Sequence, residues 1–442
     1  MIHEEKIDNI VKQVKLLAKS NNGQPIKLSK SSVSHFVPNP YSNKKLPKID
    51  IKALNEIIEI NKEKKICIAE SAVTFSDLVQ ETLKFGLIPY TVPELKTITI
   101  GGAVSGCSVE SMSYKLGGFH DSCISYELIT GKGEIINCSR EENSDIFHIL
   151  HGSYGTLGII TKVSFKLLEA KPYVRMENKF FNNFEDFWSF LQDQCNKDNY
   201  DFIDGIIHSN NKFIVCLGTM VDKADFLSSY EWLNIYYKST LTKKVDFLTT
   251  YEYFFRYDTE CHWLTKTVPI LESLPIRFLF GKIFLGSTNL IKWSERLKHV
   301  LKLKKRPDVV VDVFIPINNF EKFFKWYEKD FNFYPLWIVP YRAPEFYPWV
   351  SDEIVKKVKE PFFIDCAIYG KPNNESDIDY SEIIEKKTFE LNGIKTLISR
   401  NHYDEETFWK IYSKERIKKA KEKLDPDNIF GDMCEKFLRK TV

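Results

Sequence analysis

Residues 93–118 read Pro-Glu-Leu-Lys-Thr-Ile-Thr-Ile-Gly-Gly-Ala-Val-Ser-Gly-Cys-Ser-Val-Glu-Ser-Met-Ser-Tyr-Lys-Leu-Gly-Gly, and the rest of the chain is interpreted from this stretch. Gly101, Gly102 and Gly106 can take positive φ without a steric penalty and let a bulky ligand approach the backbone. Successive N–H groups in such a loop can form a concave anion site, with serine hydroxyls as further donors. The serines concerned are Ser108, Ser111 and Ser113. The stretch therefore predicts a loop that binds a diphosphate.

The glycine spacing by itself leaves a second interpretation open. It does not match the dinucleotide-binding pattern G-x-G-x-x-G, and there is no Walker lysine. Glycine-rich loops are also common where no ligand binds. On spacing alone, a purely structural loop stays an alternative.

Two motifs taken together carry a resemblance to a known family. Ile-Gly-Gly-Ala-Val-Ser-Gly at 100–106, followed by Glu-Ser-x-Ser-Tyr-Lys-Leu-Gly at 110–117, resembles the second flavin-contacting segment of the vanillyl-alcohol-oxidase type of FAD-binding domain. His-Gly-Ser-Tyr-Gly-Thr-Leu-Gly-Ile-Ile-Thr at 151–161 is similar to the adenine-side segment of that family. The resemblance implies that the chain binds FAD.

Within that family the resemblance is strongest to the Δ24-sterol reductases, and it covers nearly the whole chain. Matching segments are Val-Pro-Glu-Leu at 92–95, Ser-Tyr-Glu-Leu at 125–128, Asn-Ser-Asp-Ile-Phe at 143–147, Tyr-Pro-Leu-Trp at 334–337, Ile364-Asp365, Tyr369-Gly370 and Glu406-x-Phe408-Trp409. The resemblance implies non-covalent FAD, an apolar sterol- or isoprenoid-like substrate, and NADPH as the reductant.

The resemblance also indicates which residues contact the cofactor. The expected set is Ser31, Ser32, Ser34, Pro93, Gly101, Gly102, Ala103, Gly106, Ser108, Ser111, Ser113, Gly117, Gly155, Gly158, Ile160 and Arg400. The first phosphate-binding loop of the family falls at residues 25–35, where serines stand in place of glycines and Lys30 adds positive charge. Some members tether the flavin through a histidine of this loop, which would be His35; an ordinary histidine is the alternative. Arg400 is expected to stabilise negative charge at the flavin N1–C2=O.

The expected catalytic residues lie in two places. Arg256, Tyr257 and Asp258 belong to an aromatic segment, 253–263, that resembles the family's segment over the substrate face of the flavin. Tyr403 and Cys366 are further candidate acids, together with His262. Cys366 lies in an apolar strand that alternates toward the expected cavity, although a packed thiol is an alternative. His120, His148 and His151 have no zinc-site spacing, so we expect no metal.

The bulk composition limits the class of protein. A chain of 442 residues predicts more than one domain. Lys and Arg exceed Asp and Glu by only 62 to 60, which argues against nucleic acid as a partner. The nine cysteines, with no CxxC pair, predict reduced thiols and a cytoplasmic location. No apolar stretch is long enough for a membrane span, unlike the eukaryotic Δ24-sterol reductases. We expect a soluble monomer or homodimer, with peripheral membrane contact as an open alternative.

The periodicity predicts an α+β protein. Residues 5–19 have helical spacing, 124–130 and 134–138 form a hairpin, and one helix is expected over 405–423. Asn-Asn-Phe-Glu at 182–185 recurs at 318–321, each copy preceded by one strand and followed by two. Two such β-α-β-β units would build one antiparallel sheet covered by helices on one face. The expected domains are a PCMH-type FAD-binding domain (1–170), a substrate or cap domain (171–395) and a returning C-terminal segment (396–442).

Three functions are compatible with this pattern. The first is FAD-dependent reduction of a C=C bond, with hydride passing through flavin N5. The second is oxidation of a sugar or alditol hydroxyl by a flavin dehydrogenase or oxidase. The third is a binding or scaffold protein that keeps the fold without FAD, suggested by the glycine-poor first loop.

Overall fold

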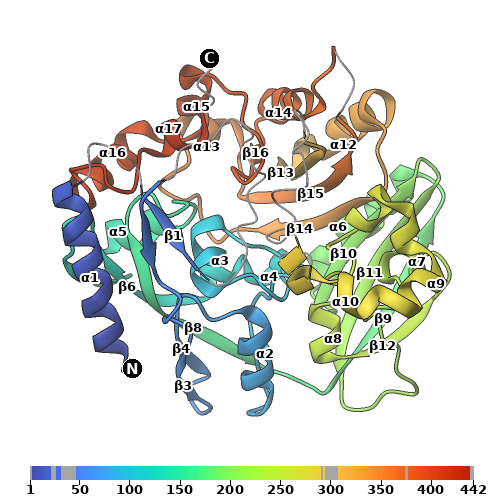
Figure 1. The fold of residues 1–442 in the computed structure, drawn as a ribbon. Coiled ribbons are helices and arrows are strands. Elements are labelled where there is room, and N and C mark those ends of the chain that lie inside the picture. Colours follow the sequence, from blue (N-terminus) through green and yellow to red (C-terminus); the bar gives the residue numbers. More distant parts are fainter. Residues whose placement is uncertain are drawn as a thin grey trace.

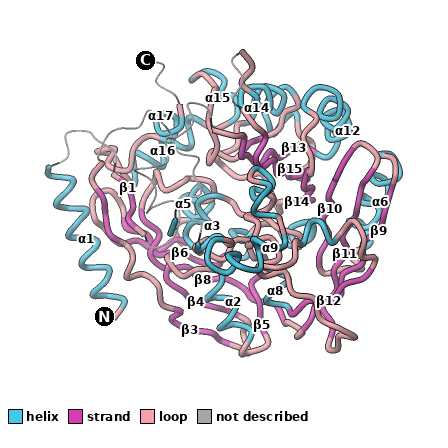
Figure 2. The backbone as a smooth tube through the Cα atoms, turned by 45° about the vertical axis from the view of Figure 1, so that its right-hand side comes forward, coloured by secondary structure: helices cyan, strands magenta, loops and turns pink. Residues whose placement is uncertain are grey.

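The computed structural model describes residues 2–20, 26–30, 46–289, 292–293, 307–373 and 377–438. Two β-sheets stand side by side, with helices around them and the glycine-rich segment between them (Figure 1). The tube view in Figure 2 shows the same arrangement, with α3 between the strands of the two sheets. Ser31, Ser32, Ser34 and His35, which the sequence assigned to the first phosphate loop, lie outside the described residues.

The first sheet has the strand order β3-β4-β8-β6-β7, with β5 paired to β8, and all of its pairings are antiparallel. Its strands are β3 Ile57–Asn61, β4 Ile66–Glu70, β5 Leu87–Pro89, β6 Cys123–Ile129, β7 Ile135–Ser139 and β8 Ile159–Glu169. The predicted hairpin is confirmed as β6 and β7. A separate parallel pair is formed by β1 Lys27–Ser29 and β2 Lys48–Asp50.

Helices surround this sheet because each has one apolar face. They are α1 His3–Ser20, α2 Phe75–Leu83, α3 Ile100–Gly106, α4 Ser113–Leu116, η1 Phe119–Ser122 and α5 Ser144–Leu150. The predicted first helix is confirmed as α1, whose Ile7, Ile10 and Val14 are buried in one cluster with Ile129 and Phe430. Apolar residues three or four positions apart share one helix face, so this burial is what the spacing requires.

The second sheet has eight strands in the order β12-β9-β11-β10-β14-β15-β13-β16, and every pairing is antiparallel. Its strands are β9 Tyr173–Phe181, β10 Phe202–Ser209, β11 Lys212–Val221, β12 Val245–Thr249, β13 Val309–Pro316, β14 Leu336–Arg342, β15 Phe362–Lys371 and β16 Ile394–Lys395. The predicted repeat is confirmed: β9-α6-β10-β11 and β13-α12-β14-β15 meet where β10 pairs with β14.

The two repeat helices, α6 Phe184–Lys197 and α12 Ile317–Trp326, cover one face of this sheet. Their aromatic residues stack between the helices, with the ring centroids of Phe184 and Phe324 4.3 Å apart. Trp188 and Phe320 follow at 4.7 Å. The opposite face is therefore the one available to the first sheet and to the candidate site.

The remaining elements connect and close the two sheets. They are α7 Tyr236–Ser239, α8 Thr250–Phe254, η2 Leu264–Thr267, η3 Pro269–Glu272, α9 Leu274–Ile276, η4 Arg277–Gly281, α10 Lys282–Phe284, η5 Tyr327–Phe331, α13 Asp352–Lys357, α14 Tyr380–Glu390, α15 Glu405–Ile411, α16 Lys414–Leu424 and α17 Met433–Phe437. The single helix predicted over 405–423 is wrong. Tyr412 has extended backbone and pairs with Val350 in an isolated bridge, which separates α15 from α16.

The C-terminal segment contacts the first sheet. The Leu424 carbonyl accepts a bond of 2.8 Å from the Gly131 N–H, and Lys421 Nζ donates to the Thr156 carbonyl at 2.8 Å. These contacts agree with a segment that returns to the N-terminal part. The domain limits 1–170, 171–395 and 396–442 stay a prediction.

Candidate functional site

The glycine-rich segment is a helix followed by a turn, whereas the sequence predicted a loop with positive φ. Gly101, Gly102 and Gly106 all lie in α3 with ordinary helical backbone. The left-handed positions come afterwards, at Cys107 (φ 55°) and Gly117 (φ 75°). The expectation of positive φ at the three glycines is therefore wrong. Their lack of a side chain serves close approach instead.

Each of these glycines faces a different neighbour. A Cβ on Gly101 would lie 2.8 Å from the Ser71 Cβ, and the Gly101 N–H donates to the Ser71 carbonyl at 2.8 Å. Gly102 is exposed, and its Cβ would lie 3.9 Å from Lys30 Nζ. A Cβ on Gly106 would meet nothing within 4 Å. The helix thus packs tightly at its start and borders open space at its end.

Two polar groups beside this helix have no hydrogen-bond partner among the residues that the structure describes. The Ser71 hydroxyl is buried and has no hydrogen-bond partner among the described residues. Lys30 makes no hydrogen bond or ion pair with any described residue, and burial lowers its pKa. A buried hydroxyl and a partly desolvated ammonium are costly unless something accepts their protons. Together with the exposed Gly102 backbone they fit the diphosphate of FAD.

The serines that follow are mostly engaged within the protein. Ser111 Oγ contacts Glu110 and lies 2.9 Å from the Tyr253 hydroxyl, and Ser113 Oγ accepts from the Glu110 N–H at 2.9 Å. Both serines are fully buried. Of the three predicted hydroxyl donors, only Ser108 has no side-chain hydrogen bond among the described residues. Ser111 and Ser113 therefore shape the segment and are not free to donate to a ligand.

The other predicted cofactor residues lie around the same helix. Ala103 and Pro93 are buried, and Ile160 belongs to the core of the first sheet. Gly117 leaves room for the Asp121 carboxylate, which would lie 2.4 Å from an added Cβ. Gly158 likewise approaches the Ile129 carbonyl, at 2.9 Å from an added Cβ, whereas Gly155 faces open space. Gly158 is thus needed for packing, while Gly155 leaves space beside the chain.

An apolar cavity opens at the end of α3, between the two sheets. The first sheet's side contributes Gly106, Cys107, Gly152 and Tyr154, and the second sheet contributes Phe314, Tyr341 and Phe363. Tyr347, Trp349, Lys395, Thr396 and Tyr412 complete the wall. Gly152 has φ 67°, and the Trp349 indole would lie 3.0 Å from an added Cβ there. The cavity is lined mainly by aromatic rings, the kind of wall that accepts a flat apolar ligand.

The predicted Arg256 lies in a fully buried charge network. Its guanidinium donates to Glu110 at 2.9 Å and to Asp204 at 2.7 Å. Burial alone would lower the pKa of Arg256, but Glu110 and the surrounding groups outweigh it and raise that pKa well above its usual value. The guanidinium thus stays charged and joins the Glu110 segment to β10 of the second sheet. Arg256 also lies over the ring of Tyr257, with its Cζ 4.8 Å from the centroid.

The two predicted residues after Arg256 differ in their surroundings. The Tyr257 hydroxyl is buried without a hydrogen-bond partner among the described residues. Asp258 accepts bonds from the Ser287 hydroxyl at 2.6 Å and from the Lys96 N–H at 2.9 Å. Burial raises the pKa of Asp258 although these donors oppose it. Asp258 therefore ties loops together, while Tyr257 keeps an unused hydroxyl.

A second buried network was mostly missed by the sequence reasoning. His262 Nε2 contacts the Glu94 carboxylate, and its ring stacks on Tyr369 with centroids 4.5 Å apart. The Tyr369 hydroxyl donates to Asp312 Oδ1 at 2.5 Å. Asp365, opposite Phe314 on the neighbouring strand, has a buried Oδ1 with no partner among the described residues. The sequence signal that could have identified this network was an aspartate within an otherwise apolar strand, in the Val-x-Asp and Ile-Asp patterns.

Burial raises the pKa of both aspartates of this network, and Asp365 is the one that keeps its proton at neutral pH. Burial raises the pKa of Asp312 to about 6. Burial, and next the nearby Asp312, raises the pKa of Asp365 well above its usual value. Both lie on the cavity side of the second sheet, because they alternate with the helix-facing residues of β13 and β15. The sheet therefore holds a proton next to the cavity-lining Phe314 and Phe363.

The backbone before this network is strained. Cys261 (φ 44°) and His262 (φ 59°) are consecutive left-handed residues without a glycine. Each such residue costs of the order of 1 kcal/mol or more and persists only where the surroundings impose it. The His262 N–H donates to the Tyr257 carbonyl at 3.1 Å, which closes the turn. The turn directs the imidazole toward Glu94 and Tyr369.

Cys366 does not face the cavity, so that expectation is wrong. Its side chain is fully buried in the cluster between the second sheet and the helices α6 and α12. The alternation of β15 places Phe363, Asp365 and Ala367 on the cavity side instead. The periodicity was correct, but the sequence alone did not show which face carries the helices.

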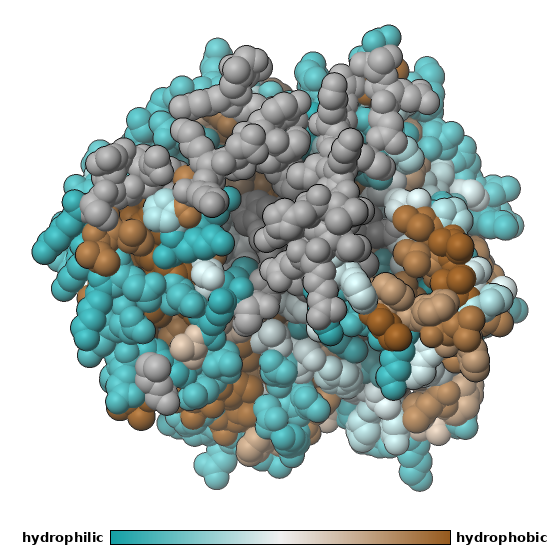
Figure 3. Space-filling view, viewed as in Figure 1, coloured by the Kyte–Doolittle hydropathy of each residue, from teal (hydrophilic) through white to brown (hydrophobic). Residues whose placement is uncertain are grey.

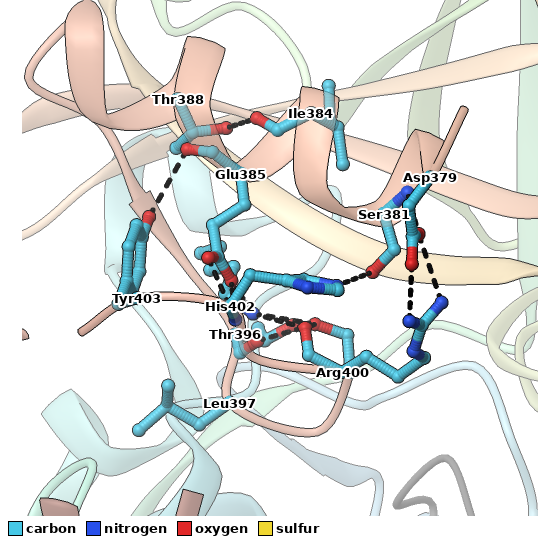
Figure 4. A network of polar contacts seen from close by, with 12 residues as sticks. Asp379, Ser381, Ile384, Glu385, Thr388, Thr396, Leu397, Arg400, His402 and Tyr403 are labelled. Carbon is cyan, nitrogen blue, oxygen red and sulfur yellow. Dashed lines mark hydrogen bonds and ion pairs between the residues drawn. The ribbon is translucent and has the colours of Figure 1, made fainter. Parts of the chain in front are cut away.

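Arg400 and Tyr403 lie in a separate polar network beside α14 (Figure 4). Both terminal nitrogens of Arg400 contact Asp379, one of them at 3.0 Å. The Tyr403 hydroxyl donates to the Glu385 carbonyl at 3.3 Å. Neither residue lines the cavity, whereas the neighbouring Lys395 does. Lys395 pairs with Glu385 at 2.8 Å, and sequence reasoning did not identify it.

All nine cysteines lie within the described residues and are free, eight of them buried and Cys107 partly exposed. His120 and His151 are buried among tyrosine and phenylalanine rings, and burial lowers the pKa of both. No group of His, Cys, Asp or Glu in the described part of the chain could hold a metal ion. Over the same residues, none of the helices combines the length and the apolarity that crossing a bilayer requires.

The cradle beside α3, the cavity between the sheets and the buried acids fit a flavoprotein of the FAD-linked oxidoreductase class. The FAD binding domain family matches residues 20–139. The resemblance to the FAD-linked oxidoreductases of the vanillyl-alcohol-oxidase superfamily, and within them to the Delta(24)-sterol reductases, is thereby confirmed.

Relatives in this branch are similar along almost the whole chain. The Delta(24)-sterol reductase of Homo sapiens is 25% identical over 459 residues, which cover 99% of this chain and 87% of the relative. The Delta(24)-sterol reductase of Arabidopsis thaliana is 22% identical, and the alignment covers 95% of this chain and 82% of that relative. Cytokinin dehydrogenase 9 of Oryza sativa subsp. japonica is 32% identical over 143 residues, 31% of this chain and 27% of that protein.

Proposed function

We infer that this protein reduces a C=C bond of an apolar, sterol- or isoprenoid-like substrate, with non-covalent FAD and with NADPH as the reductant. The observation that carries the proposal is the position of α3. Its start lies beside Lys30 and Ser71, and its end at Gly106 borders the aromatic cavity. A cofactor extended along this helix would have its diphosphate in the cradle and its ring in the cavity.

When bound, FAD supplies the hydride, which passes through N5 to one carbon of the double bond. The protein's own residues have three tasks. Lys30, Ser71 and the Gly102 backbone hold the diphosphate. The aromatic wall orients the apolar substrate and excludes water. A buried acid delivers a proton to the second carbon of the double bond.

The acid that delivers this proton belongs to the second buried network, which contains Asp312 and Asp365. The Asp312–Asp365 pair carries a proton at neutral pH because burial raises both pKa values. The Tyr369 hydroxyl donates to Asp312, and the Tyr369 ring stacks on His262, which contacts Glu94, so these side chains position the acid. Arg256 stays charged and fixes the segment after α3; we propose it as a positioning residue. Tyr257, with its unused hydroxyl, is kept as a second candidate acid.

The cavity wall favours this reaction over oxidation of a sugar or alditol. A polyhydroxylated ligand needs many hydrogen-bond partners, since each unpaired buried polar group is costly. Among the lining residues, polar side chains are few apart from Glu345, Lys395 and Thr396, and the tyrosines Tyr341 and Tyr347 bond to each other at 2.8 Å. A cytoplasmic location and a monomeric or homodimeric state belong to the same proposal.

The test is the visible spectrum of the purified protein before and after acid precipitation, followed by anaerobic mixing with NADPH. The proposal expects a yellow protein, flavin in the supernatant, and bleaching by NADPH that a Δ24-unsaturated sterol reverses. Bleaching by alditols and not by NADPH would establish the oxidase function instead. A colourless protein that takes up no FAD would identify a binding or scaffold protein.

A further inference from the structure

Eight large apolar side chains are exposed between residues 268 and 284, over η3, α9, η4 and α10. They are Val268, Ile270, Leu274, Phe278, Leu279, Phe280, Ile283 and Phe284, here called the 268–284 surface. The exposed fractions of Phe278, Leu274 and Leu279 are 71%, 65% and 63%. Figure 3 shows hydrophobic side chains gathered on the right of the view, where Figure 1 draws α9 and α10. Soluble proteins rarely expose so many apolar side chains together unless the surface binds something.

Within this segment the exposed charges are of one sign. Among the described residues from 265 to 293, the exposed charged side chains are Lys266, Lys282 and Lys292. The carboxylate of Glu272 is paired with Lys238 at 2.7 Å. The apolar surface is therefore bordered by positive charge.

The combination of exposed apolar side chains and positive charge favours one of two candidate binding partners over the other. A second copy of the chain, related by a twofold axis, would bring the same lysines against one another. An anionic lipid surface instead accepts the apolar side chains below its headgroups and pairs the headgroups with the lysines. Lys282 also lies over the Trp232 ring at 5.2 Å, an amphipathic pair suited to that boundary. We propose that the 268–284 surface docks on an anionic lipid bilayer.

The surface is attached to the turn that carries His262. Arg277, buried beneath it, pairs with Glu260 at 2.6 Å. At its other end, the Ser287 hydroxyl donates to Asp258 at 2.6 Å. Docking would thus hold residues 258–262 beside the bilayer, from which an apolar substrate could reach the cavity. Only this last step depends on the function proposed above.

Sedimentation with vesicles tests the docking. The holoprotein is mixed with vesicles of phosphatidylcholine alone, or of phosphatidylcholine with phosphatidylserine, and the bound fraction is measured. The test variant is Phe278→Ser with Leu279→Ser. The control is Ile58→Ser with Phe180→Ser, whose side chains are 46% and 42% exposed elsewhere. We expect binding only to the anionic vesicles, weakened at least about tenfold in the test variant because its buried apolar area is lost.

A third variant, Lys266→Gln with Lys282→Gln, should weaken binding to anionic vesicles and reduce its dependence on salt. Equal binding of the test and control variants would overturn the proposal, as would a wild-type protein that ignores both kinds of vesicle. Light scattering measures the oligomeric state and so tests the other candidate partner, a second copy of the chain. If the wild type is a dimer that does not bind vesicles, and Phe278→Ser with Leu279→Ser dissociates it, the surface is a dimer interface. Vesicle binding requires neither flavin nor turnover, so its failure is separate from failure of the proposed function.

Discussion

The imidazole of His262 is stacked on the phenol ring of Tyr369, with centroids 4.5 Å apart and planes inclined by 13°. The stack joins the strained turn at 261–262, which carries the histidine, to β15 of the second sheet, which carries the tyrosine. The histidine contacts Glu94, near the glycine-rich helix, and the tyrosine donates a hydrogen bond to Asp312 on β13. The stack therefore joins buried polar groups from the two halves of the molecule.

The first prediction concerns this stack. His262→Gln should lower the rate of C=C reduction about 100-fold, the lower end of the range for general acid catalysis, because the stack that positions Tyr369 against Asp312 is lost. The flavin content and the melting temperature of the protein should change little. Stopped-flow reoxidation of NADPH-reduced protein by a Δ24-unsaturated sterol measures the rate. The control is His208→Gln, which changes a half-buried histidine of β10 that bonds to Thr240, and this variant should react normally.

The second prediction concerns the pH dependence of the reaction. The ionised Asp312 is one reason why the pKa of Asp365 is raised, after burial itself. A raised carboxyl pKa keeps the acid protonated at neutral pH, and the rate should fall as pH rises through that pKa. Asp312→Asn removes the negative charge, so the falling limb should move to lower pH. A profile of kcat against pH checks the direction; an unmoved limb, with Asp330→Asn as the exposed control, would exclude this pair as the acid.

The third prediction separates two roles of the glycines in α3, which are close packing at Gly101 and room for a ligand at Gly106. Gly106→Leu adds a side chain where no atom lies within 4 Å, so the apoprotein should fold and melt normally. The same side chain would fill the end of the cavity and weaken FAD retention at least about tenfold. Gly101→Ala should instead lower the stability of the apoprotein, because its Cβ would lie 2.8 Å from the Ser71 Cβ. Flavin absorbance and thermal melts distinguish the two outcomes. Normal flavin content in Gly106→Leu would contradict the placement of the ring.

The fourth prediction concerns the ammonium beside Gly102. Lys30→Gln should weaken FAD binding about tenfold, as expected for one charge-assisted hydrogen bond to a phosphate. The apoprotein should be at least as stable as the wild type, because Lys30 has no protein partner among the described residues and is partly desolvated. Titration of apoprotein with FAD measures the first effect and chemical denaturation the second. The exposed neighbour Lys27→Gln should show neither effect.

The fifth prediction tests whether Arg400 is structural. Burial would raise the pKa of Asp379, but the Arg400 guanidinium outweighs it and lowers that pKa to about 2. Because the folded-state pKa is below the unfolded value, the pair stabilises the fold above about pH 4, and this stabilisation is lost as pH falls toward 2. Asp379→Asn should lower the free energy of unfolding by about 2 kcal/mol at neutral pH and by much less near pH 2.

Denaturant unfolding at several pH values measures this difference. Arg400→Gln should behave like Asp379→Asn at neutral pH and keep its flavin. A large loss of FAD with unchanged stability would restore the role at N1–C2=O that the sequence suggested for Arg400.

The sequence by itself determined the fold class, the repeated β-α-β-β units and the first helix, and it predicted the glycine-rich segment as the flavin site. These follow from local periods and short motifs: Phe184 and Phe320 recur at helix spacing, and the glycines of 101–106 mark a close approach of the backbone. The tertiary structure decided what no local pattern contains. It showed that α6 and α12 share one face of the second sheet, which buries Cys366 and directs Asp365 to the cavity. It also paired Arg400 with Asp379 and placed Lys395 at the cavity instead. Such pairings depend on residues far apart in the sequence, and their energies come from burial that only the assembled chain creates.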